Sequence, residues 1–388
     1  MKQIIKSEIY DSFKCSADQC PFTCCEDWEI AIDHETYAKW IGDAWISRNL
    51  TKTVRTKNKK HEAVYSIRMN EKRMCPYLSS EQLCSLVINQ GEEFIPGTCR
   101  IFPRVINDGS ELQELSLSCA CPEVVDMLRD INNSVKHLDQ SKALVESGDA
   151  FVTELRQAMI VVLQKPGYTL KHRLFLCFHM LLELQHNSGN QKSILDNYIQ
   201  ETQLDKANEL WKYCEQGQTT ELWVNTFLEV SELFLDIVQN YRRRRKYKEK
   251  LQALTDLAEE LLEAQEEEAL ISYSKEYATQ FQSSFEQYDK LLENCLVTKI
   301  FANCCSNSID DTIMSFQIII TEYVMTKYSA FLKTKVTDNS VELYTILRDY
   351  IVVYSRIIEY NMDGMKEFWA DSFGEASWEM GYLLLLLG

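Results

Sequence analysis

The chain of 388 residues lacks long apolar runs, and its longest, such as the C-terminal YLLLLLG, is far too short to span a bilayer. The opening MKQIIKSEIY has two lysines but no apolar run behind them, so we expect no signal peptide and a cytoplasmic protein. Positive charge is also scarce, because 41 Lys and Arg stand against 58 Asp and Glu. The net charge of −17 argues against nucleic acid or an anionic membrane as the main partner.

Proline and glycine are rare in most of the chain, at six and twelve residues, and five of the prolines lie at or before Pro122. From about residue 140, apolar residues recur every three or four positions, as in FVTELRQAMIVVL and RLFLCFHMLLEL. This period predicts roughly eight packed helices. No G-x-G stands between a strand and a helix, so a Rossmann-type nucleotide site is not expected.

Cysteine, in contrast, is abundant: there are fourteen, and nine fall before residue 122. The nine candidate metal ligands are Cys15, Cys20, Cys24, Cys25, Cys75, Cys84, Cys99, Cys119 and Cys121. Disulfides do not persist in a reducing cytosol, so clustered cysteines there predict metal ligands or redox chemistry. We interpret them as metal ligands. The alternative is a thiol-redox or metal-transfer protein in which Cys24 and Cys25 are an exchanging pair.

Thiolates suit zinc and the irons of an iron–sulfur cluster equally well, so the residue types leave the metal open. Neither a double Cys-x2-Cys nor the Cys-x3-Cys-x2-Cys of radical enzymes is present. A Cys-Pro pair, as at Cys121-Pro122, recurs around iron–sulfur ligands. Cys177, Cys214 and Cys295 are expected to be core residues, and Cys304 and Cys305 structural. Glu26 and Asp27 are interpreted as solvated loop carboxylates; the alternative is that they orient a ligand or a substrate amine.

The fold class predicted is α+β, mainly α, with two domains. Residues 1–135 form a cysteine-rich metal-binding domain of short strands and helices, and residues 136–388 form a helical bundle. In the first, WEIAID and AVYSIRMN alternate like strands, and Asp33 caps a helix over HETYAKWIGD. Ser79 and Ser80 open a helix around EQLCSLVINQ. RVINDGSELQELSLS predicts a hairpin, and Pro122 begins another helix.

Taken together, four ordered motifs resemble the flagellin lysine N-methylase family, within the wider group of cysteine-rich, zinc- or iron-chelating proteins with a CxxCxxCC-type signature. The motifs are CSADQCPFTCC, MCPYL, LCSLVINQGEEFIPGTCRIFPRVIN and LSLSCACPE. They cover roughly residues 5 to 130, in order and with similar gaps. The chain departs from the pattern at CACPE, which has two cysteines where one is expected, and in the gap of four after Cys15.

The resemblance implies methyl transfer from S-adenosylmethionine to lysine side chains of flagellin, by a protein of the bacterial flagellum system with an iron–sulfur centre. A 4Fe–4S cluster is the first expectation and zinc the alternative. The matched positions Cys15, Cys20, Cys24, Cys25, Cys75, Cys84 and Cys99 would supply its ligands, with either Cys119 or Cys121. The competing hypothesis is a non-catalytic zinc- or iron-binding module whose helical domain docks a partner.

Overall fold

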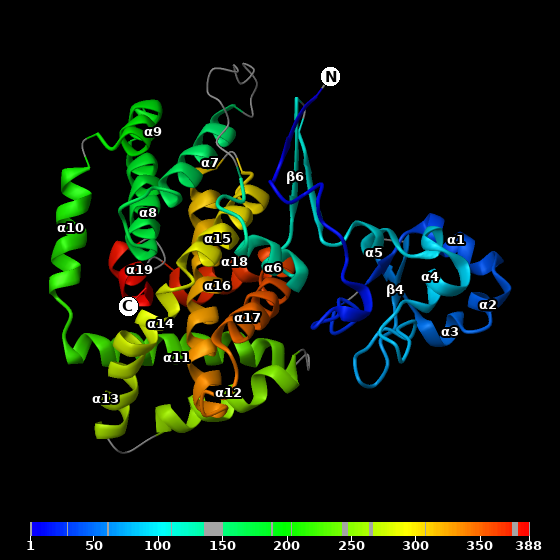
Figure 1. Ribbon diagram of the computed structural model, residues 1–388. Coiled ribbons are helices and arrows are strands. Elements are labelled where there is room, and N and C mark those ends of the chain that lie inside the picture. The colour runs from blue at the N-terminus through cyan, green and yellow to red at the C-terminus, as the bar shows by residue number, and fades with distance from the viewer. Residues whose placement is uncertain are drawn as a thin grey trace.

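The computed structural model describes residues 2–28, 30–59, 62–109, 111–135, 150–187, 189–202, 204–242, 247–263, 267–306, 308–374 and 379–387. It shows a large helical main body and a smaller lobe beside it (Figure 1). We use "small lobe" for residues 30–101, which hold β2 through α5, and "main body" for β1, β5, β6 and α6 through α19. Helices with two small sheets confirm the predicted α+β, mainly α class.

The main body is built from helices that follow one another along the chain. Their bounds are α6 (Pro122–Arg129), α7 (Ala150–Leu163), α8 (Leu170–His186), α9 (Gln191–Gln200), α10 (Asp205–Gln216), α11 (Thr220–Arg242), α12 (Lys248–Glu263), α13 (Glu267–Glu276), the π-helical turn η3 (Tyr277–Phe281), α14 (Gln282–Glu286), α15 (Asp289–Asn303), α16 (Ile309–Val336), α17 (Leu343–Ile357), the 3-10 turn η4 (Glu359–Asn361), α18 (Met362–Phe373) and α19 (Met380–Leu387). The elements are shorter and more numerous than the roughly eight helices predicted, because the chain turns at points that apolar periodicity does not mark.

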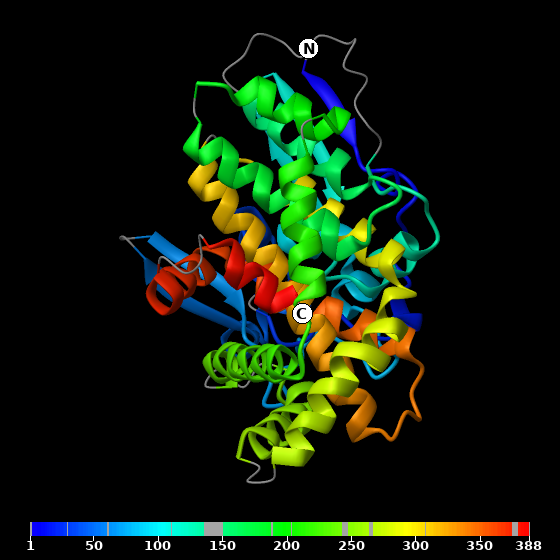
Figure 2. The same ribbon diagram turned by 90° about the vertical axis from the view of Figure 1, so that its left-hand side faces the viewer.

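Helix α16 is the centre of the main body, buried along most of its 28 residues and packed against α8, α11, α12, α15, α17 and α18. The Ser308 hydroxyl accepts a hydrogen bond from the Asp311 amide at its start. Acidic residues in its first turn and lysines in its last turn complement the helix dipole. Seen from the side in Figure 2, the C-terminal end of the chain lies among the helices of this body.

A three-stranded sheet lies along the main body. Strand β1 (Gln3–Lys6) pairs in parallel with β6 (Leu112–Leu117), and β5 (Arg104–Asp108) pairs with β6 antiparallel. The β5–β6 hairpin confirms the predicted one. Strand β5 extends through Asn107 and Asp108, and residue 110 lies outside the described part. The predicted helix at Pro122 is α6, with the proline in its first turn.

The small lobe holds a second sheet, in the order β2 (Ala31–Ile32), β4 (Glu62–Ile67), β3 (Val54–Lys59), all antiparallel. Short helices cover it: α1 (His34–Gly42), α2 (Ala44–Ser47), α3 (Leu50–Thr53), α4 (Ser85–Gln90), the 3-10 turn η2 (Glu92–Phe94) and α5 (Gly97–Ile101). Another 3-10 turn, η1 (Ala17–Gln19), precedes the lobe.

Asp33 caps α1 as predicted, accepting from the amide of Thr36 at 2.8 Å and also from that of Gly97 at 2.9 Å. The helix predicted to open at Ser79 and Ser80 was wrong, because α4 begins only at Ser85. The Ser79 hydroxyl instead accepts from the amides of Glu81 and Leu83, and Gln82 has a positive φ of 61°, so the segment is a turn.

Two apolar cores correspond to the two parts. The small lobe buries a compact set: Ile30, Ile32, Trp40, Ile46, Val54, Ile67, Cys75, Tyr77 and Leu86. The main-body core is several times larger and also takes in Ile5, Ile9, Phe13 and Leu117 from before residue 135. The predicted domain boundary at 135/136 stays a prediction, since residues 136–149 lie outside the described part. No helix in the described residues is long and apolar enough to cross a membrane.

Candidate cysteine centre and ligand pocket

The backbone brings distant cysteines together at the border between the small lobe and the main body. The amide of Cys75 donates to the carbonyl of Cys25 at 2.7 Å, beside an antiparallel bridge between Glu26 and Met74. A second bridge joins Leu78 to Cys84 and turns Cys84 back toward this point. Loops that are far apart in sequence are therefore held by main-chain hydrogen bonds, with their cysteines near one another.

The thiols themselves form a connected set. Cys24 and Cys25 are hydrogen-bonded through their side chains, and Cys25 is hydrogen-bonded to Cys75. Cys99, in α5, interacts electrostatically with Cys25, Cys24 and Cys84.

The other side of this set faces the main body. Cys121, at the start of α6, interacts with Cys20 and Cys24, and Cys20 interacts in turn with Cys15. We call the eight connected residues the cysteine centre: Cys15, Cys20, Cys24, Cys25, Cys75, Cys84, Cys99 and Cys121. Cys25 packs on the small core, whereas Cys121 belongs to the main core.

Cys119, the ninth candidate, is placed elsewhere. Its thiol is hydrogen-bonded to Cys295 in the interior of the main body, near the buried Lys299. Of the two cysteines in CACPE, only Cys121 therefore lies at the cysteine centre. Cys295 and Cys177 are buried, as predicted for core residues.

Burial and mutual contact raise the pKa values of Cys24, Cys25 and Cys121 and keep these three thiols protonated. Burial raises the pKa of Cys121 to about 12. At Cys25, the hydrogen bond with Cys24 lowers the pKa, but the one with Cys75, together with burial, raises it to about 12. The pKa of Cys24 is raised well above its usual value, first by its hydrogen bond with Cys25 and then by burial. A metal bound here must therefore displace protons, so its affinity should increase with pH.

Arg356, on α17 of the main body, anchors the loops of the cysteine centre. Its guanidinium donates to the carbonyls of Thr23 (2.9 Å), Phe22 (3.1 Å) and Ala120 (2.9 Å), and lies 4.2 Å from the centre of the Phe22 ring. One buried cation thus fixes the Cys20–Cys25 loop and the Cys119–Cys121 turn at once.

Asp27 makes a second link, and its interpretation as a solvated loop carboxylate was wrong. Its side chain is buried, accepts from Arg73 Nε at 2.5 Å, and accepts from the amide of Tyr247 at 3.1 Å. Tyr247 stands just before α12, so this carboxylate also ties the loop to the main body. Burial raises the pKa of Glu26.

The donor set of the cysteine centre suits a soft metal or an iron–sulfur cluster, since sulfur ligands dominate both kinds of site. In the described part of the chain, however, no three His, Cys, Asp or Glu side chains meet at one point in a geometry that would hold a metal ion. The thiols stand as a chain of neighbours. Metal binding would require several of them to rotate toward a common point.

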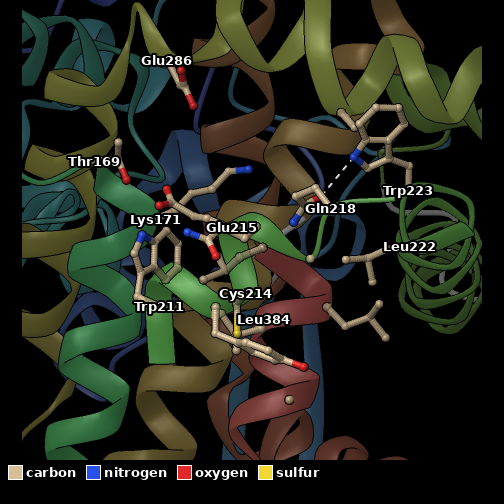
Figure 3. A pocket seen from close by; sticks show the side chains of 17 residues that line it. Thr169, Lys171, Trp211, Cys214, Glu215, Gln218, Leu222, Trp223, Glu286 and Leu384 are labelled. Atoms are coloured by element: carbon tan, nitrogen blue, oxygen red, sulfur yellow. Dashed lines mark hydrogen bonds between the residues drawn. The ribbon is translucent and has the colours of Figure 1, made fainter. Parts of the chain in front are cut away.

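A separate feature of the main body is a pocket of about 940 Å³, between the start of α8, the end of α10, the start of α11, η3–α14 and α19 (Figure 3). Trp211 and Trp223 line opposite sides of it in that view. Trp211 stacks on His172, with ring centres 4.7 Å apart and planes at 8°. The indole nitrogen of Trp223 donates to Gln218 at 3.0 Å. Both rings are therefore held in place by neighbours.

Three charged side chains line the same pocket: Lys171, Glu215 and Glu286. Burial lowers the pKa of Lys171 to about 8, against the attraction of Glu286, Asp289 and Glu215. Burial also raises the pKa of Asp289 to about 6. The pocket thus combines aromatic walls with charges of both signs.

Sequence reasoning missed this pocket. Cys214 was predicted to be core, but it is only partly buried and lines the cavity. The residues that meet here come from five separate helical segments, and no local spacing links them. The one available signal was the concentration of tryptophans at 211 and 223 around a polar turn, which resembles ordinary amphipathic packing.

Comparison with known proteins shows the family to which this chain belongs. The model of the FliB lysine N-methylase C-terminal domain matches residues 156–386, more than half of the chain, and that region holds the pocket. Because of that match, the chain belongs to the FliB lysine N-methylase family, as its motifs predicted. No solved structure matches it.

Curated relatives with modest sequence identity to this chain carry names that agree with this family. The flagellar biosynthetic protein FliU of Salmonella muenchen is 30% identical over 133 residues, which is 33% of this chain and 79% of that protein. A lysine-N-methylase of Salmonella typhimurium strain LT2 is 28% identical over 141 residues, and one of Salmonella choleraesuis strain SC-B67 is 29% identical over 134. Each match covers 33% of this chain and 33% of the lysine-N-methylase, so the aligned stretch spans about a third of those relatives' length.

Proposed function

We propose that this protein transfers methyl groups from S-adenosylmethionine to lysine side chains of flagellin in the cytoplasm, and that its cysteine centre holds an iron–sulfur cluster. The observation that carries the proposal is the match of residues 156–386 to the lysine N-methylase family. The relatives' names, lysine-N-methylase and flagellar biosynthetic protein, support the reaction and the flagellar substrate.

Methyl transfer needs a neutral amine. The lysine nitrogen forms a bond to the methyl carbon, the bond from that carbon to sulfur breaks, and the sulfonium becomes a thioether. The nitrogen must shed its proton to a base. Because a free lysine has a pKa near 10.4, reaching the neutral form near pH 7.4 costs roughly 4 kcal/mol.

In this proposal the ligands of the cluster come from the eight residues of the cysteine centre: Cys15, Cys20, Cys24, Cys25, Cys75, Cys84, Cys99 and Cys121. A bound 4Fe–4S cluster would supply sulfur-ligated iron at the border of the two parts. The chain's own contribution is to hold the loops there, through Arg356 and Asp27.

The non-catalytic module is the second candidate, and the placement of the thiols favours it. They lie between a small core and a large one, where a structural metal can contribute on the order of 10–16 kcal/mol to folding. Such a metal would stabilise the small lobe without taking part in a reaction.

One experiment separates the two. The protein is purified without oxygen, analysed for iron, sulfide and zinc, and then incubated with flagellin and methyl-labelled S-adenosylmethionine. The proposal predicts stoichiometric iron and sulfide together with label on flagellin lysines. Zinc alone, with no label transferred, would contradict it and leave the metal-binding module.

A further inference from the structure

The small lobe differs from the rest of the chain in its charge. Residues 30–101 hold 11 Lys and Arg against 8 Asp and Glu, so the lobe carries a net charge of +3. Because the whole chain carries −17, the remaining residues carry −20. No acidic residue stands between Asp43 and Glu62, and six of the lobe's basic residues fall in that interval. One part of an acidic protein is therefore basic.

Exposed cations gather on one side of this lobe. We use "basic face" for four of them: Arg48, Lys52, Arg55 and Arg68. They come from the end of α2, from α3, from β3 and from the residue that follows β4. The amide of Arg68 donates to the carbonyl of Thr53 at 2.7 Å, and its guanidinium donates to the carbonyl of Val54 at 3.4 Å. Arg68 therefore lies beside the segment that carries Lys52 and Arg55.

The charges of the basic face are not neutralised within the molecule. In the described part of the chain, none of its four cations takes part in an ion pair. Asp43, the acidic residue that precedes them, instead caps α2 by accepting from the amides of Trp45 and Ile46 at 2.9 and 2.8 Å. The four cations are thus available to a partner.

Exposed apolar side chains also concentrate on the small lobe. Among the described residues, five of the eleven large apolar side chains that stand exposed belong to it: Ile41, Trp45, Val64, Ile88 and Ile101. The lobe makes up less than a fifth of the chain. Trp45 is 38% exposed, and its ring lies 6.3 Å from that of Tyr77, whose hydroxyl is hydrogen-bonded to Thr53. Trp45 therefore lies next to the basic face.

The residue types of this surface are those of a protein interface. Three of the four cations are arginines, and Arg and Trp are enriched in interfaces whereas Lys is depleted there. Basic side chains on an edge strand can serve merely to prevent unwanted strand pairing, and β3 is an edge strand. Arg48, Lys52 and Arg68 lie outside β3, so that role does not account for them.

The charge of the remaining chain favours a protein over a nucleic acid as the partner. A nucleic acid carries negative charge at every phosphate along its length, so the rest of the molecule repels it beyond the small lobe. A protein with an acidic segment and separate lysines meets a complementary charge at both parts of this molecule.

We infer that the basic face, together with Trp45, docks an acidic segment of the protein substrate, away from the lysine that is methylated. The inference rests on the proposed function. Helices α2 and α3 lie on the side of the small lobe that faces away from the main body, so a large partner can approach them (Figure 1). Docking of this kind holds the substrate equally before and during the reaction, so it lowers KM and leaves kcat unchanged.

The test measures the binding of flagellin by calorimetry, at low and at high salt, to the whole protein purified without oxygen. The face variant is a triple substitution of exposed cations: Arg48→Gln, Lys52→Gln and Arg55→Gln. The matched control removes the same charge from exposed positions on α9 and α10: Lys192→Gln, Lys206→Gln and Lys212→Gln. Trp45→Ala is measured separately. Circular dichroism and thermal unfolding verify that each variant is folded.

We expect the face variant to bind flagellin about tenfold more weakly than the parent at low salt, and with a smaller dependence on salt. Trp45→Ala should weaken binding about fivefold, and the control should bind as the parent does. Equal binding by the face variant and the control would overturn the inference, as would a parent that binds no flagellin. Binding of a DNA duplex or of anionic vesicles that depends on the basic face, with flagellin binding unchanged, would overturn it too.

Transfer of label from S-adenosylmethionine to flagellin is measured on the same samples. The face variant should show a raised KM for flagellin and an unchanged kcat. If the parent and both triple variants label flagellin with the same KM, the docking surface is wrong and the proposed function stands. If flagellin binding depends on the basic face but no lysine is labelled, the docking surface stands and the proposed function fails.

Discussion

The small lobe and the main body differ in how much apolar surface they bury, and therefore in how they are stabilised. Among the residues that the structure describes, the core of the lobe holds nine buried apolar side chains, around Trp40 and Tyr77. The main body buries several times as many, around a helix that is covered along most of its length. A small core provides only marginal stability by itself, and small natural domains are usually stabilised further by disulfides or bound metals. The cysteine centre lies where such support is needed.

The two parts also differ in where their charged side chains lie. The main body carries ions in its interior, such as Lys299 at 2.5 Å from Glu322 and 2.6 Å from the Ser355 hydroxyl. In the small lobe, the carboxylate of Asp33 lies instead at an exposed helix start. A large core tolerates buried ion pairs because the burial of many apolar side chains offsets their desolvation cost. A small core buries too few apolar side chains to offset that cost.

The largest expected effect is the loss of metal from the cysteine centre. Cys99→Ala should abolish iron binding and unfold the small lobe, at a cost on the order of 10 kcal/mol, while the main body stays folded. Hydrogen exchange of β3 and β4 compared with α16 measures this. Cys214→Ala is the matched control and should keep full iron content. Full iron in Cys99→Ala would remove that residue from the ligand set.

Breaking the interior ion pair should show the opposite pattern. Lys299→Met leaves Glu322 and Glu359 buried without their cation, so the main body should lose about 3–5 kcal/mol while iron content is unchanged. Urea unfolding followed by helix content measures the loss. Lys206→Met, exposed on α10, should cost less than about 0.5 kcal/mol. Equal stability of the two variants would contradict the structural role given to Lys299.

Arg356 connects the two parts, and a lysine in its place tests that connection. Arg356→Lys keeps the charge but cannot reach three carbonyls in different directions, so we expect about 2 kcal/mol of destabilisation. The thiols of the Cys20–Cys25 loop should also react faster with an alkylating reagent. Arg129→Lys, on the exposed end of α6, is the control. Alkylation rates that match in both variants would argue against the anchoring role.

The smallest effect is expected at Asp33. Slight burial opposes its ionisation, but hydrogen bonds from the amides of Thr36 and Gly97 lower its pKa to about 2. A depressed pKa stabilises the fold above the unfolded pKa near 4, and this contribution is lost as the pH falls toward 2. Because the group is exposed, we expect about 1 kcal/mol or less. Asp33→Asn should therefore differ from the parent at pH 6 and converge with it near pH 2; a constant difference across that range would contradict this.

Much of the fold followed from local patterns. The helices of the main body, the β5–β6 hairpin, the cap at Asp33 and the helix at Pro122 all obey short-range rules of period, turn and capping. The helix expected at Ser79 failed because a serine can cap a turn as well as a helix. The cysteine loops are held together by Arg356, whose guanidinium donates to the carbonyl of Phe22, 334 residues earlier in the chain. No local sequence rule encodes a contact over that separation.

The chemistry of the sites was only partly within reach of the sequence. Density and spacing marked nine cysteines as candidates, but only the fold separates Cys121 from Cys119. Both thiols lie in the main-body core, where Cys119 contacts Cys295 and Cys121 lies beside Cys20 and Cys24. The pocket was missed because its walls come from distant helices.

The most direct test of the account is hydrogen exchange on the protein purified without oxygen, compared before and after its metal is removed by a chelator. The account predicts that metal removal speeds exchange in the segments at 20–25 and 75–84 and in β3 and β4, and leaves α16 unchanged. Exchange that stays the same in those cysteine segments would contradict the account and take the metal away from the cysteine centre.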